Sequence, residues 1–202
     1  IASNLVTGDQ IAKDGFGNFY PTFSKDGKKV YYISNKSSDY FGPAGIYEYD
    51  LETKKEKNIV GGVRSTFSFI PGQEKIIYAK ISDDNKNWYN VHDLFVYDLT
   101  TKDETRLTHN LRANNPSISN DGKKIVFLFQ KDGTTNLGSV DVDGKNFKRL
   151  TFFENGEQVY NPKYSQDDSY IIFDYSYANT RDIAKVNSDG GNVEFIIATD
   201  ND

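Results

Sequence analysis

Cysteine and methionine are absent from this chain of 202 residues, which also has only two histidines and one tryptophan. Without cysteine the chain can form neither disulfide bonds nor thiolate metal sites. No apolar run approaches the roughly 18 residues of a membrane-spanning helix. The net charge is -5, and the Lys and Arg residues are scattered, whereas a nucleic-acid interface needs a basic face. We therefore expect no nucleic-acid partner and no membrane span in this segment.

Motifs that carry catalysis are missing as well. The sequence has no Gly-x-Ser-x-Gly elbow, no His-Glu-x-x-His pair and no glycine-rich phosphate loop. His92 and His109 fall in expected loops, so a Ser-His-Asp set through His109 is disfavoured. The segment 141–146 resembles the start of a calcium loop but lacks the bidentate glutamate. We expect no catalytic set, no metal site and no cofactor.

Aromatic residues are plentiful, with 14 Tyr and 14 Phe, and they favour strands. The sequence also repeats itself four times, at intervals of 46 to 49 residues. Each copy opens with a polar turn, and an apolar strand, a third strand and a fourth strand follow it. The fourth strand is centred nine residues beyond the end of the third in every copy. The opening segments are 20–27, 66–73, 115–122 and 161–168.

Four short strands per copy, joined by hairpin turns such as Asp26-Gly27 and Asp121-Gly122, form one antiparallel sheet. A repeat of this length with four strands is typical of a β-propeller blade. The sequence therefore predicts an all-β fold with about four four-stranded antiparallel blades in one propeller domain, 1–202. The expected blades are 20–60, 61–108, 113–151 and 159–198, and residues 1–19 are the end of a preceding blade plus a linker.

The repeat resembles that of TolB-like propellers. The resemblance lies in the pattern Asn-Pro-x-φ-Ser-x-Asp-Gly-Lys-Lys-Ile, in the Val-Asp-x-Asp-Gly-x-Asn hairpin that follows it, and in the Arg-Leu-Thr after the hairpin. Residues 115–151 carry it best, and 66–108 depart from it most. The resemblance implies a segment of a ring of six or more blades; a closed smaller ring and a self-associating half-ring are the alternatives. It also implies a non-catalytic scaffold of an exported bacterial envelope protein, periplasmic or in the cell envelope. Its partner would be a protein, such as a peptidoglycan-associated lipoprotein.

Two other functions remain open. The segment could be the gating propeller of a serine peptidase of the prolyl-oligopeptidase kind, or of another hydrolase, with its catalytic residues in another part of the parent protein. The remaining blades or that other domain would then be its partner. Glycan binding by loop aromatics is the third interpretation.

The candidate partner-binding residues lie where loops carry side chains that the fold does not require. In a propeller, the loop from second to third strand and the loop between blades emerge on one face. Such aromatics serve either as local plugs or as interface anchors. The residue before each repeat proline is expected at the start of the innermost strand, facing the channel mouth. The candidates are Trp88, Tyr89, Tyr40, Phe41, Tyr20, Asn115 and Asn161.

Overall fold

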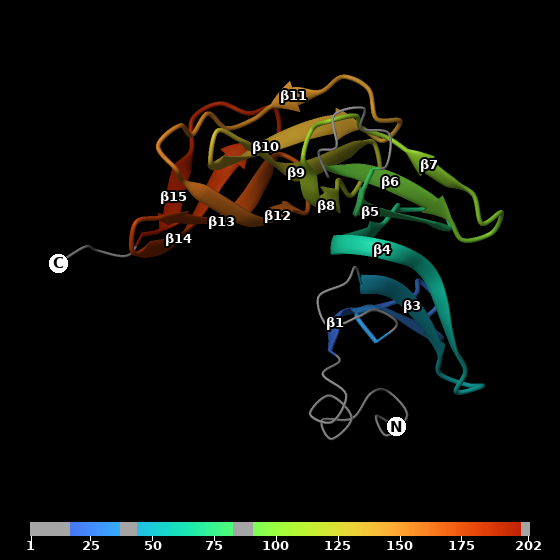
Figure 1. Cartoon of the computed structure of the whole chain (residues 1–202). Helices are drawn as coiled ribbons and strands as arrows, with labels where there is room; N and C mark the ends of the chain where they lie inside the picture. Colours follow the sequence, from blue (N-terminus) through green and yellow to red (C-terminus); the bar gives the residue numbers. More distant parts are fainter. Residues whose placement is uncertain (1–16, 37–43, 83–90, 199–202) are drawn as a thin grey trace. The chain divides into compact units, whose positions relative to one another are not determined.

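The computed structural model describes residues 17–36, 44–82 and 91–198. Within these ranges every regular element is a β-strand, fifteen in all, which confirms the predicted all-β fold (Figure 1). No helix in this part of the chain is long and apolar enough to cross a membrane. The chain divides into two compact units, residues 1–64 and 65–202.

The first unit holds an antiparallel sheet in which each strand pairs with the next along the chain. Its strands are β1 (Asn18–Phe23), β2 (Lys29–Ser34), β3 (Ala44–Asp50) and the first part of β4 (Glu56–Phe69). Tyr32 and Tyr47 stack with their ring centroids 5.7 Å apart, and Tyr49 is buried in the same cluster. Three tyrosines thus form the centre of this core.

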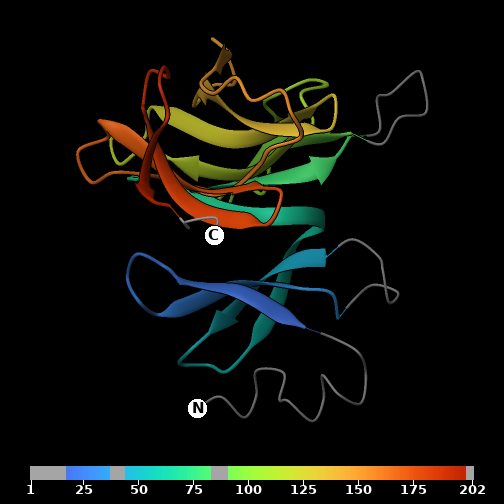
Figure 2. The same ribbon diagram turned by 90° about the vertical axis from the view of Figure 1, so that its left-hand side faces the viewer.

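The second unit begins within β4, whose neighbour in sheet order is β5, and two complete four-stranded sheets follow. In each sheet the strands lie side by side in chain order (Figure 2). The strands are β5 (Lys75–Ile81), β6 (His92–Asp98), β7 (Glu104–Arg106), β8 (Ala113–Ile118), β9 (Lys124–Lys131), β10 (Thr134–Asp141), β11 (Lys148–Arg149), β12 (Gln158–Tyr164), β13 (Tyr170–Tyr177), β14 (Thr180–Asn187) and β15 (Glu194–Ile197).

The strand register is the same in all four copies. The first apolar residue of the second strand lies opposite the residue just before the acidic or amide end of the third strand. This repeated pairing confirms the predicted order of strands within each copy. The pairs are Val30 with Tyr49, Ile76 with Tyr97, Ile125 with Val140, and Ile171 with Val186.

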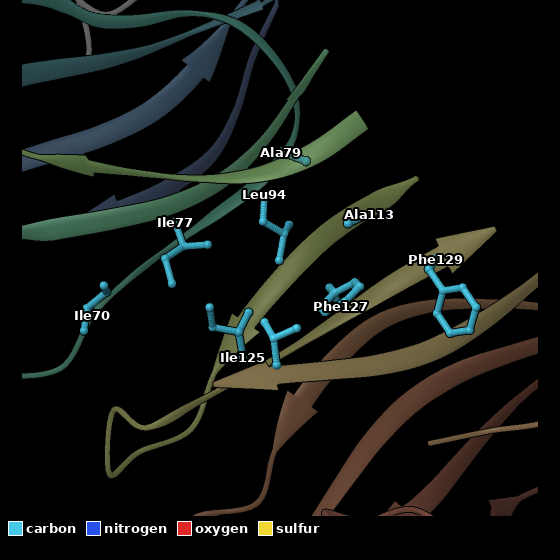
Figure 3. Close-up of a cluster of buried hydrophobic side chains, with 9 residues drawn as sticks. Ile70, Ile77, Ala79, Leu94, Ala113, Ile125, Phe127 and Phe129 are labelled. Carbon is cyan, nitrogen blue, oxygen red and sulfur yellow. The ribbon is translucent and has the colours of Figure 1, made fainter. Parts of the chain in front are cut away.

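Both faces of β9 are buried, which explains its run of consecutive apolar residues. Ile125 and Phe127 pack in one cluster with Ile77 and Leu94 of the preceding strands (Figure 3). Val126 belongs to a second cluster, which the other face of the β8–β11 sheet forms with the β12–β15 sheet. The β8–β11 sheet therefore has a hydrophobic core on each of its two faces, one shared with the preceding strands and one with the β12–β15 sheet.

An aspartate holds the opening turn in three of the four copies; the copy at 66–73 has none. Asp121 accepts hydrogen bonds from the backbone N–H of Lys123 (2.9 Å) and the hydroxyl of Ser119 (2.7 Å). At the equivalent turn Asp167 accepts hydrogen bonds from the hydroxyls of Ser165 (2.6 Å) and Ser169 (2.8 Å). All of these bonds favour the charged carboxylate.

We expect Asp121 and Asp167 to titrate well below an aspartate in an unfolded chain. The backbone N–H of Lys123 and the Ser119 hydroxyl lower the pKa of Asp121 to about 2, and the hydroxyls of Ser165 and Ser169 do the same for Asp167. An unfolded aspartate has a pKa of about 3.9. Because the folded pKa is the lower one, these bonds stabilise the fold fully above about pH 4 and are lost as pH falls through about 2.

Carboxyl carbon shifts in an NMR titration measure both values directly. Midpoints of about 3.9 for Asp121 and Asp167 would show that the turn bonds do not persist in solution.

Candidate functional site

Four of the seven candidate residues, namely Tyr40, Phe41, Trp88 and Tyr89, lie outside the described residues. Their role as plugs or as interface anchors therefore stays a prediction.

The other three candidates share an unusual backbone conformation. Tyr20, Asn115 and Asn161 have φ values of 55°, 47° and 51°, in the left-handed region. Each lies where the register of the innermost strand shifts, between residues 19 and 22, 114 and 117, and 160 and 163. Asparagine tolerates this conformation better than most residues, so the repeated bulge accounts for Asn115 and Asn161. A binding role for the three residues stays a prediction.

A buried carboxylate organises the connection between β7 and β8. Asp93 on β6 is fully buried and accepts hydrogen bonds from Arg106 (2.8 Å) and from the Thr108 hydroxyl (2.9 Å). It also accepts the backbone N–H groups of Asn110 (2.9 Å) and Leu111 (3.2 Å). One side chain thus neutralises a cation and fixes two residues of the connection.

The β8–β11 sheet repeats this arrangement with an amide. Asn136 accepts the Thr151 hydroxyl (2.9 Å) and the backbone N–H of Phe153 (2.8 Å), and donates to the Phe153 carbonyl (3.0 Å). Arg149 takes the place of Arg106, and its side chain donates to the carbonyls of Thr151 (2.7 Å) and Phe153 (3.2 Å). The Arg and Thr of the Arg-Leu-Thr motif therefore have a structural role. Together with the Asp or Asn on the third strand, they anchor the connection to the next sheet.

The β9–β10 hairpin is fixed to the connection that precedes β12. The Thr135 backbone N–H donates to the Glu157 carbonyl (3.0 Å), and the Thr135 hydroxyl donates to Gln158 (2.6 Å). The Gln158 side chain in turn donates to the Gly133 carbonyl (2.9 Å), and the Gly156 N–H to the Thr134 hydroxyl (3.0 Å). The hairpin and the connection therefore meet at one end of the sheets, as the sequence predicts for this pair of loops.

A groove of about 440 Å³ opens at this end, between the connection 110–112 and the hairpin. The side chains of Phe129 and Phe147 give it an apolar wall, and Arg112, Lys131 and Asp132 are its charged residues. A pocket of about 160 Å³ shares Lys131 and Asp132 with the groove and extends to Arg149, Phe153 and Glu154. Both walls of the groove are fixed, because Asp93 holds one and the hairpin bonds hold the other. A preorganised surface of this kind loses little entropy when a ligand binds.

The aromatic residues beside the pocket behave in two ways. Phe153 packs against Tyr175 with the ring centroids 5.2 Å apart, so it fills local space. Phe152 is 65% exposed, and the Arg149 guanidinium lies 4.7 Å from the centroid of its ring. Phe147 is also 46% exposed. We call the groove, the adjoining pocket and Phe152 together the binding face, as the candidate site for a partner.

Sequence reasoning missed the buried anchors and the groove. A signal for the anchors exists, because Asp93, Asn136 and Asp182 each lie five residues before the end of the third strand. No such signal marks Arg112 or Phe147. In the described part of the chain, no three His, Cys, Asp or Glu side chains gather as a metal site could require.

The fold and the repeat identify a β-propeller domain. Residues 7–202 match the family described as the TolB beta propeller domain, and the chain belongs to this family. Comparison with curated protein sequences finds no match.

Solved structures with the same fold include TolB from Acinetobacter baumannii, with a TM-score of 0.70 and 21% identity. The putative TolB from Agrobacterium tumefaciens has a TM-score of 0.71 and 24% identity. The chain covers 92% and 87% of its own length in these comparisons, but only 45% and 63% of those two proteins. A prolyl endopeptidase is also similar, with a TM-score of 0.67, 15% identity and coverage of 92% of this chain and 29% of that one. These likenesses concern the fold.

Proposed function

We propose that this propeller segment is a non-catalytic scaffold that binds a protein partner on the binding face, within an exported protein of the bacterial envelope. The observation that carries the proposal is the fixed, open groove with two exposed phenyl rings, Phe147 and Phe152, beside it. Large aromatic side chains bury much area at low entropic cost and often supply most of an interface's binding energy. The similarity to TolB structures supports the envelope location.

The second candidate is the gating propeller of a larger peptidase, which the likeness to a prolyl endopeptidase favours. In that case the same face would meet a catalytic domain of the same polypeptide. The two functions differ in whether the partner is a separate protein.

Photo-crosslinking in the full parent protein tests both. With p-benzoylphenylalanine at position 152 we expect crosslinks to a separate protein. With the same amino acid at position 123, at the opposite end of β9, we expect none, because Lys123 lies in the turn before that strand. A crosslink from position 152 into a hydrolase domain of the same chain would establish the gating function instead. Equal crosslinking from both positions, or none from position 152, would contradict the proposed face.

A further inference from the structure

The charges of the groove define the chemistry of its occupant. Within the part of the chain that the structure describes, neither Arg112 nor Lys131 forms an ion pair, and both side chains are exposed. Asp132 is the single carboxylate among the groove residues. The groove therefore has a net charge of about one positive unit in a chain whose net charge is -5. This excess suits a ligand with one or two carboxylates and not a polyanion.

The apolar wall adds a second requirement. Phe129 and Phe147 meet edge to face, with centroids 5.6 Å apart, and Phe147 also contacts Phe127 at 6.2 Å. The Phe147 ring is therefore held in place although nearly half of its surface is open. An apolar or aromatic side chain of a ligand that covers this ring would bury it.

The third observation on the groove is the backbone conformation of Arg112. Arg112 has a φ of 50°, a left-handed conformation in which arginine is uncommon. Asp132 also has a positive φ, but it stands before Gly133 in a two-residue hairpin that requires this conformation. Arg112 lies in the connection that Asp93 fixes through the N–H groups of Asn110 and Leu111, and Asn110 there also has a positive φ of 59°. Strained residues of this kind concentrate at binding sites.

We infer that the groove binds a peptide segment in which one acidic residue lies close to a large apolar residue. The carboxylate meets Arg112 and Lys131, and the apolar side chain covers Phe147. The lining combines one net positive charge with the exposed ring of Phe147, and a peptide that carries an acidic and an apolar side chain meets both features. We therefore choose a peptide as the occupant, and the test below includes a glycan. The inference rests on the proposed function and specifies its partner.

The test selects peptides from a random library displayed on phage, with the chain immobilised. The expected peptides contain Asp or Glu within a few residues of Trp, Phe or Leu. Fluorescence anisotropy then measures the affinity of one selected peptide, synthesised with its acidic residue or with the matching amide. We expect the amide version to bind about tenfold more weakly.

Protein variants separate the charge from the fold. Arg112→Ala combined with Lys131→Ala should weaken peptide binding about tenfold, whereas Lys123→Ala, which removes an exposed lysine at the other end of β9, should leave it unchanged. Asp132→Asn should tighten binding about two- to threefold, because it removes a like charge near the peptide carboxylate. Asn-Gly suits this hairpin at least as well as Asp-Gly, so the fold is preserved. Thermal unfolding of each variant checks that.

Several results would overturn the inference. The selected peptides could lack acidic residues, or the combined Arg112 and Lys131 substitutions could leave the peptide affinity unchanged. A weaker peptide affinity in Asp132→Asn would count against the inference in the same way. Retention of the chain by an acidic oligosaccharide such as oligogalacturonate, with no peptide selected, would assign the groove to glycans. If position 152 crosslinks to a protein that lacks such a segment, the scaffold proposal stands and this inference fails.

Discussion

Replacement of Asp93 with alanine should lower the free energy of unfolding of the second unit by about 3–5 kcal/mol. The carboxylate is fully buried and satisfies the Arg106 guanidinium, the Thr108 hydroxyl and two backbone N–H groups. Without it the Arg106 guanidinium, whose side chain is only 13% exposed, loses its 2.8 Å ion pair with this carboxylate. The backbone donors of Asn110 and Leu111 also lose their acceptor, and each unsatisfied group adds to the loss.

Urea denaturation followed by circular dichroism measures the effect, with two comparison variants. Asp93→Asn should cost less, about 1–3 kcal/mol, because the neighbouring sheet uses Asn136 at the same position with Arg149 bonded to carbonyls. Asp103→Ala removes an exposed carboxylate near β7 and should change stability by less than about 0.5 kcal/mol. If Asp93→Ala matched Asp103→Ala, Asp93 would not anchor the connection.

The fold was predictable because its determinants are local and repeated. The apolar second strands and the constant spacing to the fourth strand recur in every copy, and Asp-Gly turns open two of the four copies, so a single pattern predicted the register. The β9 run from Ile125 to Leu128 indicates burial on both faces, and the two core clusters confirm it. In the fourth copy Asp168 replaces the turn glycine and keeps a positive φ of 58°. Its carboxylate accepts hydrogen bonds from the backbone N–H groups of Asn120 and Asp121.

The groove of the binding face was not predictable in the same way, because its residues come from segments with no shared pattern. Arg112 precedes β8, Lys131 ends β9, and Phe147 lies in the turn before β11; only tertiary packing brings them to one groove. Adjacent aromatics such as Phe152 and Phe153 look equivalent in the sequence. Asn136 bonds both backbone groups of Phe153, and the Phe153 ring packs against Tyr175. The Phe152 ring is exposed.

Replacement of Gly144 with alanine should destabilise the second unit by about 3 kcal/mol. Gly144 has a φ of 84°, where an L-residue is strained by about 1 kcal/mol. A Cβ at this position would also clash with the backbone of Leu107, with the carbonyl carbon only 3.0 Å away and the carbonyl oxygen closer still. Leu107 is followed by the anchored residues Thr108 and Asn110, so its backbone cannot move aside without disturbing the bonds to Asp93. Overpacking against a fixed backbone typically costs about 1–3 kcal/mol in addition.

Gly133→Ala supplies the matched comparison, because Gly133 lies in the hairpin at the other end of β10 and has a similar φ of 76°. A Cβ there meets nothing within 4 Å, so this variant carries the backbone strain without the clash and should cost about 1 kcal/mol. The difference between the two losses, measured by urea denaturation, therefore reports the close approach of the β10–β11 turn to the preceding strands. Equal losses would mean that this turn does not lie against Leu107 in solution, and the packing of the β8–β11 sheet on β5–β7 would need revision.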